Sequence, residues 1–309
     1  MLTRQTLRGT WATVLLPVSR DETIDPGRLA DELAFLVTAG LDGLYTNGTA
    51  GEFHCLDEDE YDLITDVVAQ ACRQAGVPCQ LGASHMSGQI SLRRIRVAAT
   101  YEPAAIQVIL PDWCVLSADE VRSAIDRMAR EAGPSPLVLY NPPHAKTQLT
   151  PALFGRLAAE FPQLIGIKVA GGDAAWFDQM RACVGDLSIF VAGHHLASGL
   201  GQGASGAYSN VACLSPPGAV AWYREMRADP AAAAELETRL NAFLARQVLP
   251  LQEAGFSNAA LDKTLAAIGA WAPVGTRLRW PYRSVPAEIV TRLRATAAAE
   301  LPELVPAGR

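Results

Sequence analysis

A lysine at the end of a short apolar run is the residue of this sequence best suited to chemistry. Lys168 ends the run 164–168, glycines follow it closely, and the chain holds only two other lysines, Lys146 and Lys263. A short apolar run of this kind predicts a buried strand. Because burial disfavours an ammonium, we expect a lowered pKa for Lys168 and a neutral amine that condenses with a ketone to a Schiff base. The alternative is a lysine at a strand end whose ammonium reaches water.

Other polar groups also stand at the ends of apolar runs. These segments are Asn47 to Glu52 (N-G-T-A-G-E), Tyr140 to Pro143 (Y-N-P-P), Gly193 to His195 (G-H-H) and Tyr208 to Asn210 (Y-S-N). Successive amide N–H groups in a glycine-bracketed turn bind anions, so the amides of Thr49 and Ala50 can hold a carboxylate. The phenol of Tyr140 can carry a proton. Beside an amine that forms an imine, these groups suit a 2-keto acid.

Eight apolar runs rich in β-formers alternate with helical stretches and predict the elements that position these groups. The runs span residues 11–16, 43–47, 77–83, 105–110, 137–140, 164–168, 188–192 and 206–209. Eight strands alternating with helices indicate a (β/α)₈ TIM barrel, an α/β fold. In such barrels the C-terminal strand ends meet at one mouth, which would bring Lys168, Tyr140 and the glycine-rich turn together.

Beyond the eighth run the pattern contains only helices, at 218–227, 230–251, 258–268 and 286–300. We therefore expect a catalytic barrel over residues 1–217 and a C-terminal helical region over 218–309. Because no Gly/Ser-rich or Pro-rich linker separates them, the helices should pack on the barrel. Residues 302–309 should form a frayed tail. Within the barrel, Asp25-Pro26 and the acidic run 57–60 each predict a helix start.

Composition limits the partners. A net charge of −6 and a pI near 5.4 argue against a nucleic-acid or anionic-membrane surface, so the partner should be a small molecule. No apolar run reaches the roughly 18 residues of a membrane helix. The six cysteines are scattered without a C-x-x-C pair, which favours buried free thiols in the cytoplasm over a disulfide framework.

Two apparent motifs carry little weight. Residues 201–206 satisfy G-x-G-x-x-G, but they lead from a helical stretch into a strand, the reverse of the dinucleotide-binding order. We read them as a helix end and a tight turn. His194 and His195 are adjacent, and neighbouring side chains of a strand point to opposite sides, so they should not share a metal ion. We expect neither a metal nor a cofactor.

Three motifs carry a family resemblance. G-T-A-G-E (48–52), Y-N-P-P (140–143) and G-I-K (166–168) resemble, in order and spacing, signatures of the dihydrodipicolinate synthase and N-acetylneuraminate lyase family of class I pyruvate-dependent enzymes. The resemblance implies a (β/α)₈ barrel with Lys168 as the Schiff-base lysine and Tyr140 as the proton-relay phenol. It also implies Thr49 with Ala50 as the carboxylate-binding loop and a homo-oligomer, a tetramer or a dimer. No cofactor is expected, because the lysine iminium serves as the electron sink.

Several positions depart from that family pattern. Ala50 replaces a hydroxyl residue, Trp113 stands where the family has a tyrosine, Ala145 replaces the synthase arginine, and His194-His195 replace an acidic pair of the lyase. These changes argue against the synthase activity and weaken the case for sialic-acid cleavage. The mouth would be more aromatic and less acidic than that of the lyase.

We therefore predict a lyase that reversibly cleaves or forms an aldol bond between pyruvate and an aldehyde. The alternatives are dehydration of a 2-keto-3-deoxy sugar acid through the same iminium, and a catalytically silent regulator that binds a keto acid. The aldehyde, aromatic or sugar-like, stays open. The predicted catalytic residues are Lys168, Tyr140 and Thr49, and the predicted substrate-binding residues are Gly48, Ala50, Trp113, His144, Gly193, His194, Tyr208 and Ser209.

Overall fold

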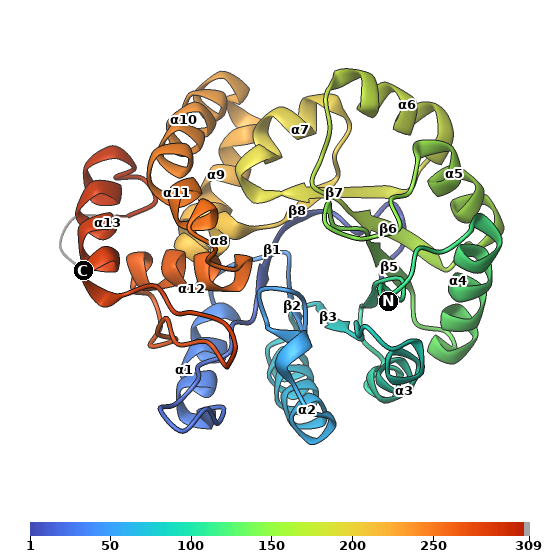
Figure 1. Ribbon diagram of the computed structural model, residues 1–309. Helices are drawn as coiled ribbons and strands as arrows, with labels where there is room; N and C mark the ends of the chain where they lie inside the picture. The colour runs from blue at the N-terminus through green and yellow to red at the C-terminus, as the bar shows by residue number, and fades with distance from the viewer. Residues whose placement is uncertain (306–309) are drawn as a thin grey trace.

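The chain folds as a closed barrel of eight parallel strands ringed by helices (Figure 1), seen in a computed structural model that describes residues 1–305. The strands are β1 (Gly9–Thr13), β2 (Gly43–Thr46), β3 (Cys79–Gly82), β4 (Ala105–Val108), β5 (Leu137–Tyr140), β6 (Leu164–Lys168), β7 (Ser188–Ala192) and β8 (Gly206–Tyr208). Each pairs in parallel with the next, and β8 pairs with β1 to close the cylinder. The predicted (β/α)₈ fold with additional C-terminal helices is confirmed.

The helices of the barrel follow its strands in turn. They are α1 (Pro26–Leu36), α2 (Glu58–Ala75), α3 (Gly88–Ala99), α4 (Ala118–Ala132), α5 (Pro151–Glu160), α6 (Ala174–Val184), α7 (Leu196–Gln202) and α8 (Asn210–Leu214), with short 3₁₀ turns η1 (Phe53–Cys55) and η2 (Gly193–His195). The two predicted starts are correct: Asp25 caps α1, and Asp57 forms a capping box with Glu60 at α2. The G-x-G-x-x-G segment ends α7 at Gly203, in the left-handed region, before β8.

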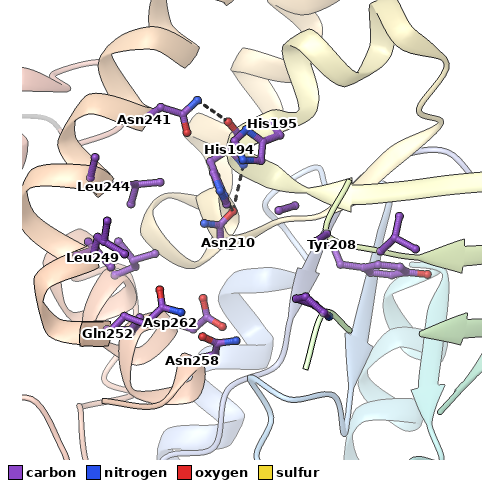
Figure 2. A pocket seen from close by; sticks show the side chains of 18 of the residues that line it. His194, His195, Tyr208, Asn210, Asn241, Leu244, Leu249, Gln252, Asn258 and Asp262 are labelled. Atoms are coloured by element: carbon purple, nitrogen blue, oxygen red, sulfur yellow. Dashed lines mark hydrogen bonds between the residues drawn. The ribbon is translucent and has the colours of Figure 1, made fainter. Parts of the chain in front are cut away.

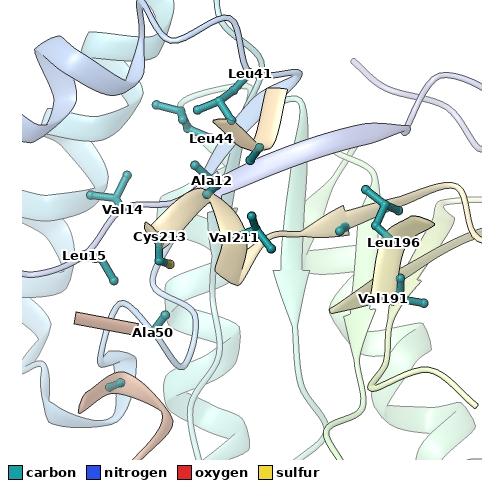
Figure 3. Packing of buried hydrophobic residues seen from close by; sticks show 14 of the residues in the cluster. Ala12, Val14, Leu15, Leu41, Leu44, Ala50, Val191, Leu196, Val211 and Cys213 are labelled. Atoms are coloured by element: carbon teal, nitrogen blue, oxygen red, sulfur yellow. The ribbon is translucent and has the colours of Figure 1, made fainter. Parts of the chain in front are cut away.

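The barrel interior is a compact aromatic and aliphatic cluster. Its members are Leu7, Trp11, Tyr45, Ala105, Val138, Ile165, Phe190 and Tyr208. The N-terminal segment closes the end of the barrel opposite the strand C-termini, where the Leu2 amide donates to the Ala104 carbonyl and the Arg4 guanidinium to the Leu164 carbonyl. A larger core fills the space between strands and helices, and Figure 3 shows Ala50, Val14 and Leu15 near Cys213 in that layer.

The C-terminal helices gather beside α8 on one side of the barrel (Figure 1). They are α9 (Pro216–Ala228), α10 (Pro230–Phe243), α11 (Leu249–Glu253), α12 (Asn258–Gly269) and α13 (Ala287–Glu300), with a π-helical segment η3 (Leu244–Val248) between α10 and α11. The single helix expected over 230–251 is thus interrupted. Pro250 has no N–H to donate to the carbonyl of residue 246, and the helix widens into the π-turn just before it.

Other boundaries differ from expectation for identifiable reasons. The first strand ends at Thr13 instead of residue 16, because the Leu15 amide donates to the Glu32 carboxylate rather than to a strand. Helix α8, directly after β8, was not predicted. The tail prediction is wrong for residues 302–305, since Leu304 and Val305 are buried; residues 306–309 lie outside the described part.

All six cysteines are free, but Cys114 and Cys183 are exposed. The division at residue 217 stays a prediction.

A buried ion pair joins α12 to the glycine-rich turn after β2. Lys263 of α12 is 0% exposed and pairs with Glu52, which is 1% exposed, while its Nζ also donates to the Arg277 carbonyl at 2.6 Å. Glu32 of α1 lies close enough to act on Lys263, and burial raises the pKa of that carboxyl to about 8. The Lys263–Glu52 pair therefore fixes α12 against the barrel mouth.

Replacing Lys263 should destabilise the fold strongly. Lys263→Met would leave the Glu52 carboxylate buried without its cation, so we expect a loss of about 3–5 kcal/mol in the free energy of unfolding, measured by urea denaturation at pH 7. Adding Glu52→Gln in the same chain should recover much of this loss, because the buried charge is then gone. A loss below about 1 kcal/mol for the single variant would contradict the account.

Candidate active site

Lys168 and Tyr140 are direct neighbours at the mouth of the barrel. They are the last residues of β6 and β5, and they are register partners in the parallel pairing of these strands. Side chains of register partners point to the same side of a sheet. The Lys168 Nζ accordingly lies 4.3 Å from the centroid of the Tyr140 ring. The structure thus brings together the two residues that the motifs single out.

Three tyrosine rings surround the Lys168 amine. Besides Tyr140, the ring centroids of Tyr45 and Tyr208 lie 5.0 and 5.3 Å from Nζ. The face of an aromatic ring attracts a cation, whereas exclusion of water disfavours one. Exclusion of water is the stronger effect here, because burial lowers the pKa of Lys168 to about 8, against a smaller opposing effect of Asp262. Roughly a tenth of the lysine is then neutral at pH 7.

The hydroxyls of these tyrosines have different surroundings. Burial raises the pKa of Tyr140, and a side-chain hydrogen bond with Thr49 opposes that rise. Tyr140 is therefore a neutral phenol at pH 7, able to donate its proton while its oxygen accepts a hydrogen bond. The Tyr208 hydroxyl instead donates to Gln80 Oε1 at 2.5 Å, toward the barrel interior (Figure 2). Tyr208 presents its ring to the amine and its hydroxyl to the core.

A pocket of about 480 Å³, with Lys168 in its lining, lies between the barrel and the C-terminal helices. Figure 2 shows this pocket from close by. The barrel contributes Tyr140, Pro143, Lys168, Val169, Ala170, Ala192, His194, His195, Tyr208 and Asn210. The C-terminal helices contribute Asn241, Leu244, Ala245, Val248, Leu249, Gln252, Asn258, Leu261, Asp262 and Leu265. Half of the wall therefore comes from helices to which the sequence analysis assigned no site residue.

Asp262 is the ionisable side chain whose charge acts most strongly on the Lys168 amine. Burial raises the pKa of Asp262 to about 7, and the charge of Lys168 opposes the rise. In turn, Asp262 raises the pKa of Lys168 against the effect of burial. Within residues 1–305 the two groups form no ion pair, so they interact across the pocket and not in contact. The pocket therefore places a carboxyl group opposite an amine.

The glycine-rich turn lies behind Tyr140. Gly48 faces the Tyr45 ring, where an added Cβ would come within 3.1 Å of a ring carbon, and Ala50 is 6% exposed in the packed core. The amide N–H groups of Thr49 and Ala50 donate to no acceptor within residues 1–305. Backbone donors without a protein partner, held in a turn, can bind an anion. The Thr49 side chain reaches Tyr140.

His194 is a neutral hydrogen-bonding group of the pocket wall. Its own amide donates to Asn210 Oδ1 at 3.2 Å, which identifies that atom as the oxygen, and Nδ1 lies 3.1 Å from the same oxygen. Nδ1 therefore carries a proton, and Nε2 keeps its lone pair. Burial, and next the neighbouring His195, lower the pKa of His194 to about 4. The two histidines lie in the η2 turn, so the strand alternation used to separate them does not apply.

Two of the eight predicted substrate-binding residues, His194 and Tyr208, line the pocket. Gly48 and Ala50 lie in the glycine-rich turn and do not line it, and the remaining four also lie outside its lining. Trp113 is 78% exposed with Lys146 stacked over its ring, and His144 is exposed; neither lines the pocket. Ser209 is 2% exposed and caps α8 by accepting from the Ala212 amide at 3.1 Å. Gly193 allows that packing, since an added Cβ would meet Ser209 Oγ at 2.4 Å. Ser209 and Gly193 thus shape the mouth from beneath the surface.

Signals for the residues that sequence reasoning missed were present in the C-terminal region. Asp262 and Lys263 are adjacent ionisable residues in an otherwise apolar helix, and burial of both would demand partners. Pro250 marks the π-turn, a distortion common at functional sites, and Leu244, Ala245 and Val248 of that turn line the pocket. Helical periodicity alone does not show which barrel face a helix covers.

Two further properties concern the described residues only. Among residues 1–305, no cluster of three or more His, Cys, Asp and Glu side chains is arranged to hold a metal ion. No helix in that part combines the length and the apolar character that crossing a bilayer requires.

Comparison with known proteins gives consistent matches along the chain. A family model described as the dihydrodipicolinate synthetase family matches residues 6–300. The N-acetylneuraminate lyase of Rhizobium meliloti is 29% identical over 297 residues, covering 94% of this chain and 95% of the lyase. A 4-hydroxy-tetrahydrodipicolinate synthase of Thermomicrobium roseum is 30% identical over 214 residues, covering 67% of this chain and 69% of the synthase.

A solved structure shows the same fold. It is a prophage protein of E. coli K12 that belongs to the dihydrodipicolinic acid synthase family and was crystallised with pyruvate. The TM-score is 0.83 at 22% identity, covering 95% of this chain and 98% of that chain. The barrel and its C-terminal helices are therefore a shared architecture.

The pKa of Lys168 can be measured directly, because the chain has only three lysines. Reductive methylation with ¹³C-formaldehyde should give few NMR signals, and Lys168→Ala identifies the one that titrates near pH 8. Asp262→Asn should move this pKa further down, because the carboxylate that favours the ammonium is gone. A Lys168 signal that titrates above pH 10, as in water, would contradict the burial argument.

Proposed function

The chain belongs to the dihydrodipicolinate synthetase family, and on that premise we propose that it is a Schiff-base lyase that reversibly cleaves a 2-keto acid to pyruvate and an aldehyde. The relatives are lyases and synthases, which supports an enzyme of the aldolase type. The single observation that carries the finer proposal is the Lys168 amine, enclosed by three tyrosine rings with its pKa lowered to about 8. A catalytically silent binder would not require a lysine kept partly uncharged.

The proposed reaction starts at the keto group. The neutral Lys168 amine adds to C2, and loss of water from the carbinolamine gives an iminium. A base takes the proton of the C4 hydroxyl, the C3–C4 bond breaks, and its electron pair moves into the iminium to give an enamine. The aldehyde leaves, C3 of the enamine is protonated, and hydrolysis releases pyruvate and the free amine.

Two groups near Lys168 fit the remaining roles. Tyr140 is the proposed proton carrier, because its phenol stays neutral at pH 7 beside the amine and interacts with Thr49. The Thr49 and Ala50 amides, without protein acceptors in residues 1–305, are the proposed site of the substrate carboxylate. No cofactor is needed in this scheme, since the iminium itself accepts the electron pair.

The same iminium also acidifies the hydrogens on C3, so loss of a hydroxyl from a 2-keto-3-deoxy sugar acid is the second candidate reaction. Asp262 favours keeping this candidate, because a carboxyl group whose pKa is near 7 can protonate a leaving hydroxyl. The products distinguish the two: pyruvate is released only by cleavage. The homo-oligomer stays a prediction from the family resemblance, and the cytoplasmic location stays a prediction from the cysteine pattern.

Incubation with pyruvate and borohydride tests the proposal. We expect reduction of the imine to leave one pyruvate-derived group on Lys168, located by mass spectrometry of peptides. Lys168→Ala should abolish the adduct, and Lys146→Ala, which removes an exposed lysine, should leave it unchanged. A protein that gains no mass, or gains it at Lys146, would show that Lys168 is not the reacting amine.

Replacing Tyr140 should separate imine formation from turnover. Tyr140→Phe keeps the ring beside the amine but removes the proton carrier, so kcat should fall about 10²–10⁴-fold while the borohydride adduct still forms. The comparison uses pyruvate release from a 2-keto-4-hydroxy acid that the wild type cleaves. A variant with an unaltered kcat would exclude Tyr140 as the proton carrier.

A further inference from the structure

We infer that Asp262 determines which aldehyde the enzyme accepts: it receives a hydrogen bond from a hydroxyl group of an uncharged aldehyde and excludes aldehydes that carry a carboxylate or phosphate. This inference rests on the proposed function and extends it to the second half of the substrate. It assigns the role to a residue of α12, outside the barrel strands that carry Lys168 and Tyr140.

Asp262 lies on the pocket wall opposite the barrel. Asn258, one helical turn earlier, lines the same wall, and Figure 2 shows the two side chains together across from Tyr208 and Asn210. The Asp262 carboxylate accepts no hydrogen bond from any residue in 1–305. Asp262 is half-buried and lines the pocket, so its carboxylate oxygens are accessible from the pocket. Its lone pairs are therefore open to a ligand in the pocket.

The charges of the wall exclude a second anion. Among residues 1–305, Lys168 is the only lysine or arginine that lines the pocket, and in the proposed reaction its amine is bonded to C2 of the keto acid. His194 is neutral because its pKa is lowered to about 4. Above its pKa of about 7, Asp262 is a carboxylate, and in the condensation step Lys168 is part of a neutral enamine. A carboxylate or phosphate on the aldehyde would then face a like charge, which costs several kcal/mol at a binding site.

The hydrogen-bonding groups favour a donor on the ligand. The Asp262 oxygens and the free Nε2 of His194 are acceptors, and a hydroxyl group can donate to either. Around them, Leu244, Val248 and Leu249 form apolar wall without charge. An uncharged hydroxyaldehyde matches this arrangement.

A structural role does not account for Asp262. The adjacent Lys263 already fixes α12 to the barrel through its buried pair with Glu52. Asp262 makes no such contact and interacts with Lys168 only across the pocket.

A matched pair of aldehydes tests the inference. Glyceraldehyde and glyceraldehyde 3-phosphate differ only by the phosphate, and condensation of each with pyruvate gives a ratio of kcat/KM values. Any effect of Asp262 on the Lys168 pKa or on enamine formation is common to both aldehydes and cancels in the ratio. At pH 9, well above the Asp262 pKa of about 7, we expect the wild type to favour glyceraldehyde by about 100-fold or more.

The variants are Asp262→Asn and Asp262→Ser, with Asp31→Asn on the exposed surface of α1 as the control for loss of one negative charge. In either Asp262 variant the ratio should fall about tenfold or more, and in the control it should stay at the wild-type value. A smaller fall, or an enzyme that forms the pyruvate adduct but does not condense with glyceraldehyde, overturns the inference. Absence of the pyruvate adduct in the wild type would instead refute the proposed function.

Discussion

Exclusion of water from one amine is the constraint on which this structure depends. Lys168 sits where β6 reaches the barrel mouth, with the rings of Tyr45, Tyr140 and Tyr208 around its Nζ. Aromatic faces attract an ammonium, but they also replace the water that would hydrate it, and the lowered pKa shows that the loss of hydration is the larger effect. The strands make this possible, because their parallel register places Tyr140 beside Lys168.

The C-terminal helices close the pocket on the side that the barrel mouth leaves open to solvent. A barrel mouth alone would expose the amine to solvent on one side, and α10 to α12 with the π-turn close that side into a pocket. Their position depends on the buried Lys263–Glu52 pair, which ties α12 to the glycine-rich turn that contains Thr49 and Ala50. Two adjacent residues of α12 therefore have different roles. Lys263 fixes the helix against the barrel, and Asp262 supplies the ionisable carboxyl group of the pocket wall.

Much of this arrangement could be predicted from the sequence, and the rest could not for physical reasons. Strand C-termini converge in any parallel barrel, so Lys168 and Tyr140 could be placed together from their positions in two apolar runs. The roles of Tyr45 and Asp262 could not, because alternation along a strand does not tell which barrel layer a side chain joins, and helical periodicity does not tell which surface a helix covers. Trp113 shows the reverse limit: a motif position suggested a site residue, but the loop after β4 turns outward and leaves it exposed.

The most direct test of the central claim is a crystal structure of the protein soaked in pyruvate. The account predicts continuous electron density between Lys168 Nζ and C2 of pyruvate, with the carboxylate on the amides of Thr49 and Ala50 and the Tyr140 hydroxyl beside the new bond. Pyruvate bound in the pocket without a bond to Lys168, or an amine turned away from the three rings into solvent, would contradict it.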